Sequence, residues 1–285
     1  MHEHDETDHV DGGIDHDLPR VLSRRKALGG LLGTASLAFL AGCGSGGSTA
    51  TASSTATQPR GGPGGAPPGG ASNVTVAAGE IPEETAGPYP GDGSNGANVL
   101  TESGIVRRDI RSSIAGASGV AAGIPLTIKL KLLDLSGTTS TPLQGGAVYL
   151  WHCDRDGNYS MYSPAVADEN YLRGVQAADK DGFLAFQSIF PGCYAGRWPH
   201  LHFEVYASVA KATSSANKMR TSQIALPKDV CAKVYATSGY EQSVGNLGQL
   251  SLDGDNIFSD GYSLQLAKLS GSNAQGWTAE LTVPV

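Results

Sequence analysis

The 285-residue chain carries 20 Lys and Arg residues against 27 Asp and Glu residues, which gives a formal net charge of −7 at pH 7. This mildly acidic balance gives no excess of positive charge, so it argues against a protein that binds nucleic acid or an anionic membrane surface. The length allows one large domain or two small ones, before targeting and linker segments are subtracted.

Residues 1–42 have the features of an export signal. Arg24 and Arg25 stand in a Ser-Arg-Arg-Lys-Ala-Leu run, a twin-arginine pattern, and a short apolar stretch follows. That stretch ends in Leu-Ala-Gly-Cys, which resembles a bacterial lipobox, so Cys43 is expected to be acylated. We therefore expect an exported protein anchored to the outer face of the cytoplasmic membrane. An uncleaved single-pass anchor is the alternative, and it places the chain on the same side.

Two segments of biased composition lie before the expected domain. Residues 1–20 contain seven acidic residues and four histidines, a composition also found in metal-binding tracts, but cleavage of the signal would remove them. Residues 43–75 are almost wholly Gly, Ser, Thr, Ala and Pro, with too little apolar surface to offset the entropy of ordering. We expect this second segment to be a flexible tether.

The cysteines beyond the lipobox limit the disulfides that can form. Cys153, Cys193 and Cys231 are three in number. In an oxidising compartment this odd number allows at most one internal disulfide, and the sequence leaves the pairing open.

Residues 76–285 are expected to form a single β domain. Short apolar or alternating runs are separated by Gly, Asp, Asn and Pro turns, without an internal repeat or a long helical periodicity. The expected strands lie at residues 126–133, 146–153, 183–189, 200–206 and 277–283. The first alternates as a half-buried strand does, and the second is more continuously apolar. This pattern predicts an all-β fold, a β-sandwich of mixed, largely antiparallel sheets.

The expected strand at residues 200–206 places two histidines on one face. Side chains at positions i and i+2 of a strand project from the same side, so His200 and His202 are close enough to bind one metal ion. The pair alone is a weak signal, because buried histidines are commonly satisfied by ordinary hydrogen bonds. His152 stands alone in a buried-type strand and is interpreted as such a hydrogen-bonded core residue.

The residues around this pair resemble the signature of intradiol ring-cleavage dioxygenases. Residues 191–202 are Pro-Gly-Cys-Tyr-Ala-Gly-Arg-Trp-Pro-His-Leu-His, and Gly-Asn-Tyr-Ser occupies residues 157–160. Residues 85–89 are similar to the family's Gly-Pro-aromatic stretch, and residues 221–223 are similar to its glutamine segment. The four motifs occur in the order that the family has.

The resemblance implies a non-haem iron(III) cofactor and assigns its ligands. Tyr159 would be the permanent tyrosinate ligand, Tyr194 the tyrosinate that the substrate displaces, and His200 and His202 the imidazole ligands. Two phenolates suit this assignment, because Fe(III) is a hard cation that ionises a phenol whose ordinary pKa is about 10.

The resemblance also implies an activity. Both atoms of O2 would be inserted into a catechol-type aromatic diol, with intradiol cleavage to a cis,cis-muconate-type diacid. The freed Tyr194 would accept a substrate proton, Arg197 would stabilise the developing negative charge, and Gln223 would lie near the reacting carbon. The tether leaves no room before Thr85 for the helical dimerisation region of the catechol 1,2-dioxygenase branch. The chain is therefore expected to be closer to protocatechuate 3,4-dioxygenase β-subunit-like proteins.

Other interpretations compete with the dioxygenase. A cupin needs a further histidine downstream, and none follows His202; a zinc amidohydrolase barrel needs more chain than the 83 residues that remain. Single residues also have ordinary roles, such as an ion pair between Arg197 and Glu204. The remaining alternative is an exported β-sandwich that binds aromatics or polysaccharide without turnover, and the intact set of iron ligands favours the enzyme.

Overall fold

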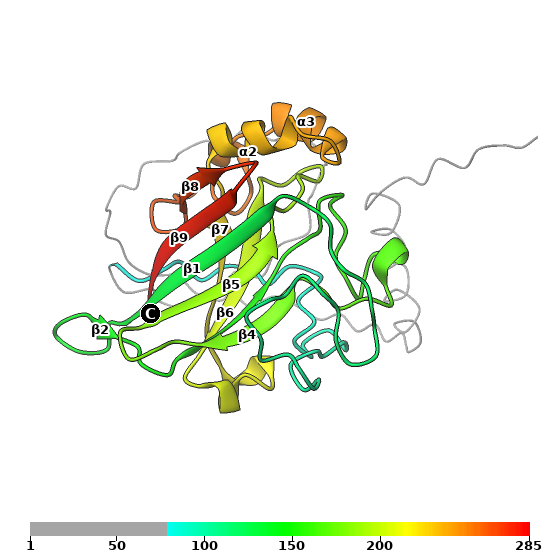
Figure 1. Ribbon diagram of the computed structural model, residues 1–285. Coiled ribbons are helices and arrows are strands. Elements are labelled where there is room, and N and C mark those ends of the chain that lie inside the picture. The colour runs from blue at the N-terminus through cyan, green and yellow to red at the C-terminus, as the bar shows by residue number, and fades with distance from the viewer. Residues whose placement is uncertain (1–78) are drawn as a thin grey trace, which may run out of the picture. The chain divides into compact units, whose positions relative to one another are not determined.

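The computed structural model describes residues 79–285, so the expected signal, Cys43 and the expected tether lie outside the described part. The described residues form two β-sheets, with two short α-helices near one end of the strands (Figure 1). Neither of these helices is long and apolar enough to cross a membrane.

The first sheet is built around its longest strand. Its members are β1 (Pro125–Asp134), β2 (Thr141–Pro142), β5 (Phe183–Ile189), β8 (Lys268–Ser272) and β9 (Gly276–Pro284). Strand β1 pairs antiparallel with β2 and β5 and parallel with β9, and β8 pairs antiparallel with β9. The side chains of β1 alternate between buried and more exposed, as the pattern at residues 126–133 predicted.

The second sheet carries the histidine pair. Its members, in spatial order, are β4 (Arg173–Ala177), β3 (Ala147–Trp151), β6 (His200–Tyr206) and β7 (Lys218–Ala225), and all neighbours are antiparallel. Every residue of β3 and β6 is buried. Strand β6 therefore buries its histidine face as well as its apolar face, which only a strand covered on both sides can do.

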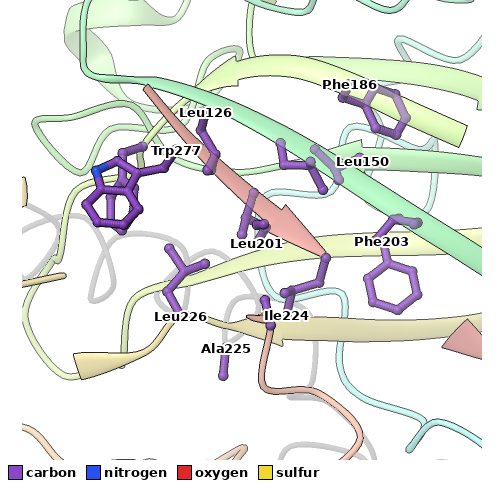
Figure 2. Packing of buried hydrophobic residues seen from close by; sticks show 14 of the residues in the cluster. Leu126, Leu150, Phe186, Leu201, Phe203, Ile224, Ala225, Leu226 and Trp277 are labelled. Carbon is purple, nitrogen blue, oxygen red and sulfur yellow. The ribbon is translucent and has the colours of Figure 1, made fainter. Parts of the chain in front are cut away.

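The main core lies between the two sheets. Figure 2 shows Leu126 of β1 and Phe186 of β5 packed with Leu150 of β3 and with Leu201 and Phe203 of β6. Burial of each such side chain contributes roughly 1.5–3 kcal/mol to folding. The mixed, largely antiparallel β-sandwich expected from the sequence is confirmed.

Two helices that the sequence did not predict follow β7. They are α2 (Lys228–Tyr235) and α3 (Glu241–Gly248), each eight residues long. Helix α2 buries Val230, Val234 and Tyr235 in the main core. The Tyr235 hydroxyl donates a hydrogen bond to the Pro191 carbonyl at 3.1 Å. This contact fixes the start of the segment that carries Tyr194.

The three cysteines of the described residues, Cys153, Cys193 and Cys231, are all free and buried. Cys153 Sγ lies 3.6 Å from the Gly192 carbonyl oxygen, and Cys193 Sγ lies 3.8 Å from the Arg197 carbonyl oxygen. Two of the thiols thus pack against the backbone of the segment that precedes β6.

Candidate active site

Four side chains from three parts of the chain meet at one point. The Tyr159 and Tyr194 hydroxyl oxygens are 3.4 Å apart, and the Tyr194 oxygen is 3.3 Å from His200 Nε2. His200 Nε2 is in turn 3.0 Å from His202 Nε2. The four residues that the resemblance assigned as metal ligands therefore lie together, with their oxygen and nitrogen atoms facing one another.

A hydrogen-bonded turn brings the two tyrosines together. Asp154 Oδ1 accepts hydrogen bonds from the backbone N–H groups of Asp156 and Asn158, each at 2.9 Å, and so shapes the loop that leads to Tyr159. Gly157 in this loop has φ of 87°, and a Cβ atom there would lie 3.1 Å from Tyr194 Cβ. Glycine thus supplies both the left-handed backbone and the close approach of the two loops.

The two histidines are oriented in different ways. The His200 ring is hydrogen-bonded through Nδ1 to the Trp198 carbonyl oxygen. The His202 ring stacks on Trp151, with centroids 5.0 Å apart and planes 8° apart, while its Nδ1 has no hydrogen-bond partner among the described residues. Gly87 lies beside the same ring, because an added Cβ atom there would be 3.5 Å from His202 Cε1.

The electrostatics of the protein alone keep all four groups neutral. Burial raises the pKa of the Tyr159 and Tyr194 hydroxyls above the ordinary value for tyrosine. Burial lowers the pKa of His200, as does the positive charge of Arg197, and burial lowers the pKa of His202. Neutral imidazoles are ready to bind a metal ion, whereas the phenols need a cation to ionise.

The residues present fit a hard metal ion. Two phenol oxygens and two imidazole nitrogens form a donor set suited to ferric iron. Among residues 79–285, no group of three or more His, Cys, Asp or Glu side chains is placed to hold a metal ion. A metal at this site would therefore depend on the oxygens of Tyr159 and Tyr194.

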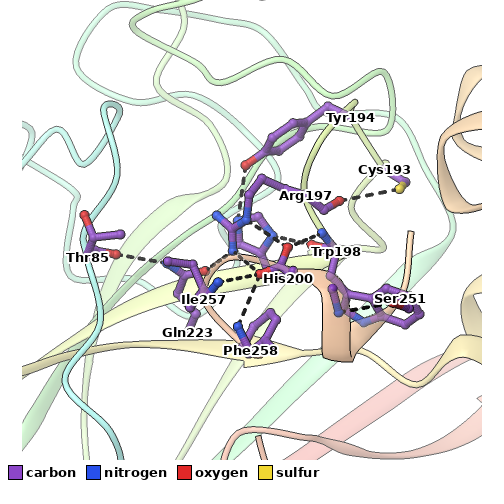
Figure 3. A network of polar contacts seen from close by, with 12 residues as sticks. Thr85, Cys193, Tyr194, Arg197, Trp198, His200, Gln223, Ser251, Ile257 and Phe258 are labelled. Carbon is purple, nitrogen blue, oxygen red and sulfur yellow. Dashed lines mark hydrogen bonds and ion pairs between the residues drawn. The ribbon is translucent and has the colours of Figure 1, made fainter. Parts of the chain in front are cut away.

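Arg197 and Gln223 lie in one polar network beside His200 (Figure 3). Arg197 Nη2 donates to Gln223 Oε1 at 2.7 Å, and Arg197 Nε donates to Asp255 Oδ2 at 3.0 Å. Gln223 stands opposite His202 in the pairing of β6 with β7, and its Nε2 donates to the Thr85 carbonyl at 3.0 Å. The structure therefore brings together the remaining residues that the sequence had nominated.

The alternative ion pair between Arg197 and Glu204 is wrong. Glu204 is fully buried and accepts a hydrogen bond from the Tyr206 hydroxyl at 2.6 Å, and Lys218 Nζ lies 3.5 Å from its other oxygen. Asp255 takes the place beside Arg197 instead. Sequence reasoning missed Asp255, because it lies 58 residues beyond Arg197 and outside every motif.

His152 has the ordinary role that was predicted for it. Its Nδ1 lies 2.7 Å from the Cys153 carbonyl oxygen, and its Nε2 lies 2.6 Å from Ser188 Oγ. Both ring nitrogens are occupied by hydrogen bonds, and the residue is buried. The interpretation of His152 as a hydrogen-bonded core residue is confirmed.

Part of the sequence is similar to known proteins. The profile of a family described as Dioxygenase matches residues 108–229. A chlorocatechol 1,2-dioxygenase from Rhodococcus opacus is 44% identical over 57 residues, which is 20% of this chain and 22% of that protein. A catechol 1,2-dioxygenase from a Pseudomonas strain is 33% identical over 57 residues, or 20% of this chain and 18% of that protein. The chain thus matches about a fifth of the length of these relatives.

A solved structure shares the fold. The chain is similar to an intradiol ring-cleavage dioxygenase from Tetranychus urticae, with a TM-score of 0.55 and 23% sequence identity. The match covers 72% of this chain and 93% of the other. The two proteins therefore have the same β-sandwich architecture.

Proposed function

We propose that this chain is a non-haem iron(III) dioxygenase of the intradiol ring-cleavage family, as the family match over residues 108–229 and the chlorocatechol 1,2-dioxygenase relative support. The proposed reaction inserts both atoms of O2 into a catechol-type diol and opens the ring between the two hydroxylated carbons. The observation that carries the proposal is that Tyr159, Tyr194, His200 and His202 meet in this order, with successive donor atoms 3.4, 3.3 and 3.0 Å apart.

These four residues would hold the iron. A bound ferric ion would take up the two adjacent oxygens of a diol and make the aromatic ring reactive towards O2. The protein's part is to fix the donor atoms and to keep water away from them. The buried Tyr159, His200 and His202 meet both requirements.

The two tyrosines are suited to different roles. Tyr159 is 2% exposed, whereas Tyr194 is only partly buried. The two residues that follow Tyr194, Ala195 and Gly196, are exposed. Tyr194 is therefore the residue placed to move aside when a substrate enters. Its oxygen would then accept a proton from a substrate hydroxyl.

Arg197 supplies positive charge at the site. Its side chain is 16% exposed, and Asp255 and Gln223 occupy its Nε and Nη2 groups. We assign it the stabilisation of negative charge that develops on the substrate, which a fixed cation in a poorly hydrated site does effectively. Gln223, held at both ends, would contact the substrate near the reacting carbon.

Oxygen consumption by the purified, iron-loaded protein tests the proposal. A series of substituted catechols should support O2 uptake, and isotopically labelled O2 should place both atoms in a ring-opened diacid. Tyr159→Phe, matched for protein concentration, is the control for unspecific oxidation by loosely bound iron. An iron-loaded protein that binds catechols without consuming O2 would instead support the binding-module alternative.

The site of action is a separate proposal that rests on the sequence alone. Arg24 and Arg25 followed by an apolar run and the lipobox at Cys43 support export and anchoring at the outer face of the cytoplasmic membrane. Substrates would then be aromatic diols that reach the enzyme from outside the cytoplasm.

A further inference from the structure

Asp255 is a fully buried carboxylate that joins two segments of the site. Its side chain is 0% exposed. The residue directly follows a short 3₁₀ helix, Leu252–Gly254. It accepts five hydrogen bonds, and the donors are Arg197 Nε at 3.0 Å, Arg197 Nη2 at 3.4 Å, and the backbone N–H groups of Trp198 at 2.7 Å, Ile257 at 2.9 Å and Phe258 at 3.3 Å. The carboxylate therefore holds Arg197 and its neighbour Trp198 against the loop at residues 255–258.

The contact with Arg197 is the part of this arrangement that needs a charge. The backbone N–H groups need only acceptor oxygens, which carry no required charge, whereas a buried carboxylate is costly unless a cation is paired with it. Two oxygens of Asp255 face the Nε and Nη2 edge of the guanidinium, a geometry that sets its plane as well as its position. Within residues 79–285, Arg197 Nη1 has no hydrogen-bond partner.

The same contact extends to Gln223. Arg197 Nη2 donates to Gln223 Oε1, and Gln223 Nε2 donates to the carbonyl of Thr85. Thr85 lies two residues before Gly87, where an added Cβ atom would be 3.5 Å from His202 Cε1. A shift of the guanidinium would thus also shift the amide that stands opposite His202 in the sheet.

We propose that Asp255 is a positioning residue of the dioxygenase reaction, which orients the Arg197 guanidinium and, through it, the Gln223 amide. The inference rests on the proposed function. Asp255 contacts no group that we assign as a metal ligand, and its remaining hydrogen bonds are to backbone N–H groups.

The test is a double-mutant cycle with Asp255→Asn and Arg197→Ala. Asp255→Asn keeps the size of the side chain, removes its charge and replaces one of its two acceptor oxygens by an NH2 group. Each single variant should bind iron and lower kcat by about 10²-fold, the loss typical of a missing transition-state contact. The double variant should be no slower than Arg197→Ala alone, because residues that act as a unit are strongly non-additive. The KM for the catechol should change less than kcat.

A matched control separates positioning from stability. Asp179 also accepts backbone hydrogen bonds, from Asp181 at 2.9 Å and Phe183 at 2.8 Å, but lies in an exposed turn. Asp179→Asn should leave kcat unchanged. If Asp255→Asn does not yield folded protein, Asp255→Glu displaces the charge by one methylene group and should show the same loss of kcat with iron retained.

Two further readouts do not depend on turnover. Anaerobic titration with nitrocatechol should give weaker binding to Asp255→Asn and to Arg197→Ala by similar factors, and crystals of Asp255→Asn should show the guanidinium and the Gln223 amide displaced. Wild-type kcat in Asp255→Asn, additive losses in the cycle, or an unmoved guanidinium would each overturn the inference. A wild type that consumes no O2 with any catechol rejects the proposed function instead, and the titration and the crystals still decide the role of Asp255.

Discussion

Trp151 stacks on His202, with ring centroids 5.0 Å apart and an angle of 8° between the planes. Tyr149 also stacks on Trp151, at 5.0 Å and 21°. The three side chains are buried. Because His202 Nδ1 lacks a hydrogen-bond partner among the described residues, the stack sets the orientation of this ring, which in most metal-binding histidines is set by a hydrogen bond.

Trp151→Leu is therefore expected to weaken iron retention. Loss of the groups that orient a metal ligand commonly costs about 10–100-fold in metal affinity, and we expect the lower end, roughly 10-fold. Competition with a chelator measures it. Phe186→Leu, a core substitution on β5, controls for general destabilisation; equal rates of iron loss from the two variants would contradict the prediction.

Tyr159→Phe and Tyr194→Phe should differ in their spectra. The wild-type holoprotein should be red to burgundy through charge transfer from phenolate to iron. Tyr159→Phe removes a ligand that is expected to remain bound, so iron retention should fall and the visible band should shift. Tyr194→Phe should differ from the wild type only at rest, because substrate is expected to displace this oxygen. Anaerobic titration with a catechol measures both effects. A colourless iron-loaded wild type would be incompatible with two tyrosinate ligands.

His152→Leu should reduce stability without removing iron. Burial lowers the pKa of His152 to about 4, so the ring is neutral at ordinary pH and serves only its two hydrogen bonds. Loss of the ring leaves Ser188 Oγ without this partner, which costs about 1–3 kcal/mol. Thermal unfolding and iron analysis measure the two quantities. His200→Ala is the contrasting variant, and it should lose iron; a comparable loss from His152→Leu would show that the core interpretation is incomplete.

The hydropathy pattern of the sequence predicted the strands that are buried on one face only and the strands that consist wholly of apolar residues. Strand β1 alternates and β3 is continuously apolar, so both could be recognised. Strand β7 could not, because Lys-Met-Arg-Thr-Ser-Gln-Ile-Ala has no apolar period, although six of its eight residues are buried. Some of its polar side chains have hydrogen-bond partners elsewhere in the chain, as Gln223 does at Arg197 and Thr85.

Strand β4 was missed for the same reason. It begins with Arg173, which is 1% exposed and donates hydrogen bonds to the carbonyls of Tyr89, Pro90 and Ser160. A buried arginine satisfied by backbone carbonyls leaves no trace in a hydropathy pattern. Prediction of the site had a similar limit. The metal ligands lie within short motifs and could be named from the sequence, whereas Asp255 could be found only through tertiary contacts.

Replacement of Arg24 and Arg25 by lysine should abolish export. The prediction depends on the twin-arginine pattern, a route that would allow iron to be loaded before a folded protein crosses the membrane. Fractionation of cells that produce the double variant should find the protein in the cytoplasm. Cys43→Ala is the companion variant: it should leave export intact and release the protein from the membrane. An unchanged amount in the membrane fraction of the twin-lysine variant would reject this route.

Glu84 should make stability fall as pH rises. Its Oε1 accepts a hydrogen bond from Gln265 Nε2 at 3.2 Å, and the charges that face it are those of Asp260, Arg197 and Asp255. Burial raises the pKa of Glu84 from 4.5 to about 7, the charges of Asp260 and Asp255 add to the effect, and the Gln265 hydrogen bond and the charge of Arg197 oppose it.

The sign of the effect follows from proton binding. Between pH 4.5 and 7 the folded protein holds a proton on Glu84 that the unfolded chain has released. The contribution of Glu84 is therefore fully present below the unfolded pKa and is lost as pH rises through the folded pKa. Glu84→Gln keeps the hydrogen-bonding shape without the titration, so its melting temperature minus that of the wild type should increase from pH 5 to pH 8. Since the carboxyl is partly exposed, we expect a modest increase of roughly 2 °C.

Glu102→Gln, which removes an exposed carboxyl, controls for the loss of one negative charge, with iron content held equal in all samples. A difference between Glu84→Gln and wild type that stays constant with pH would show that Glu84 does not hold this proton.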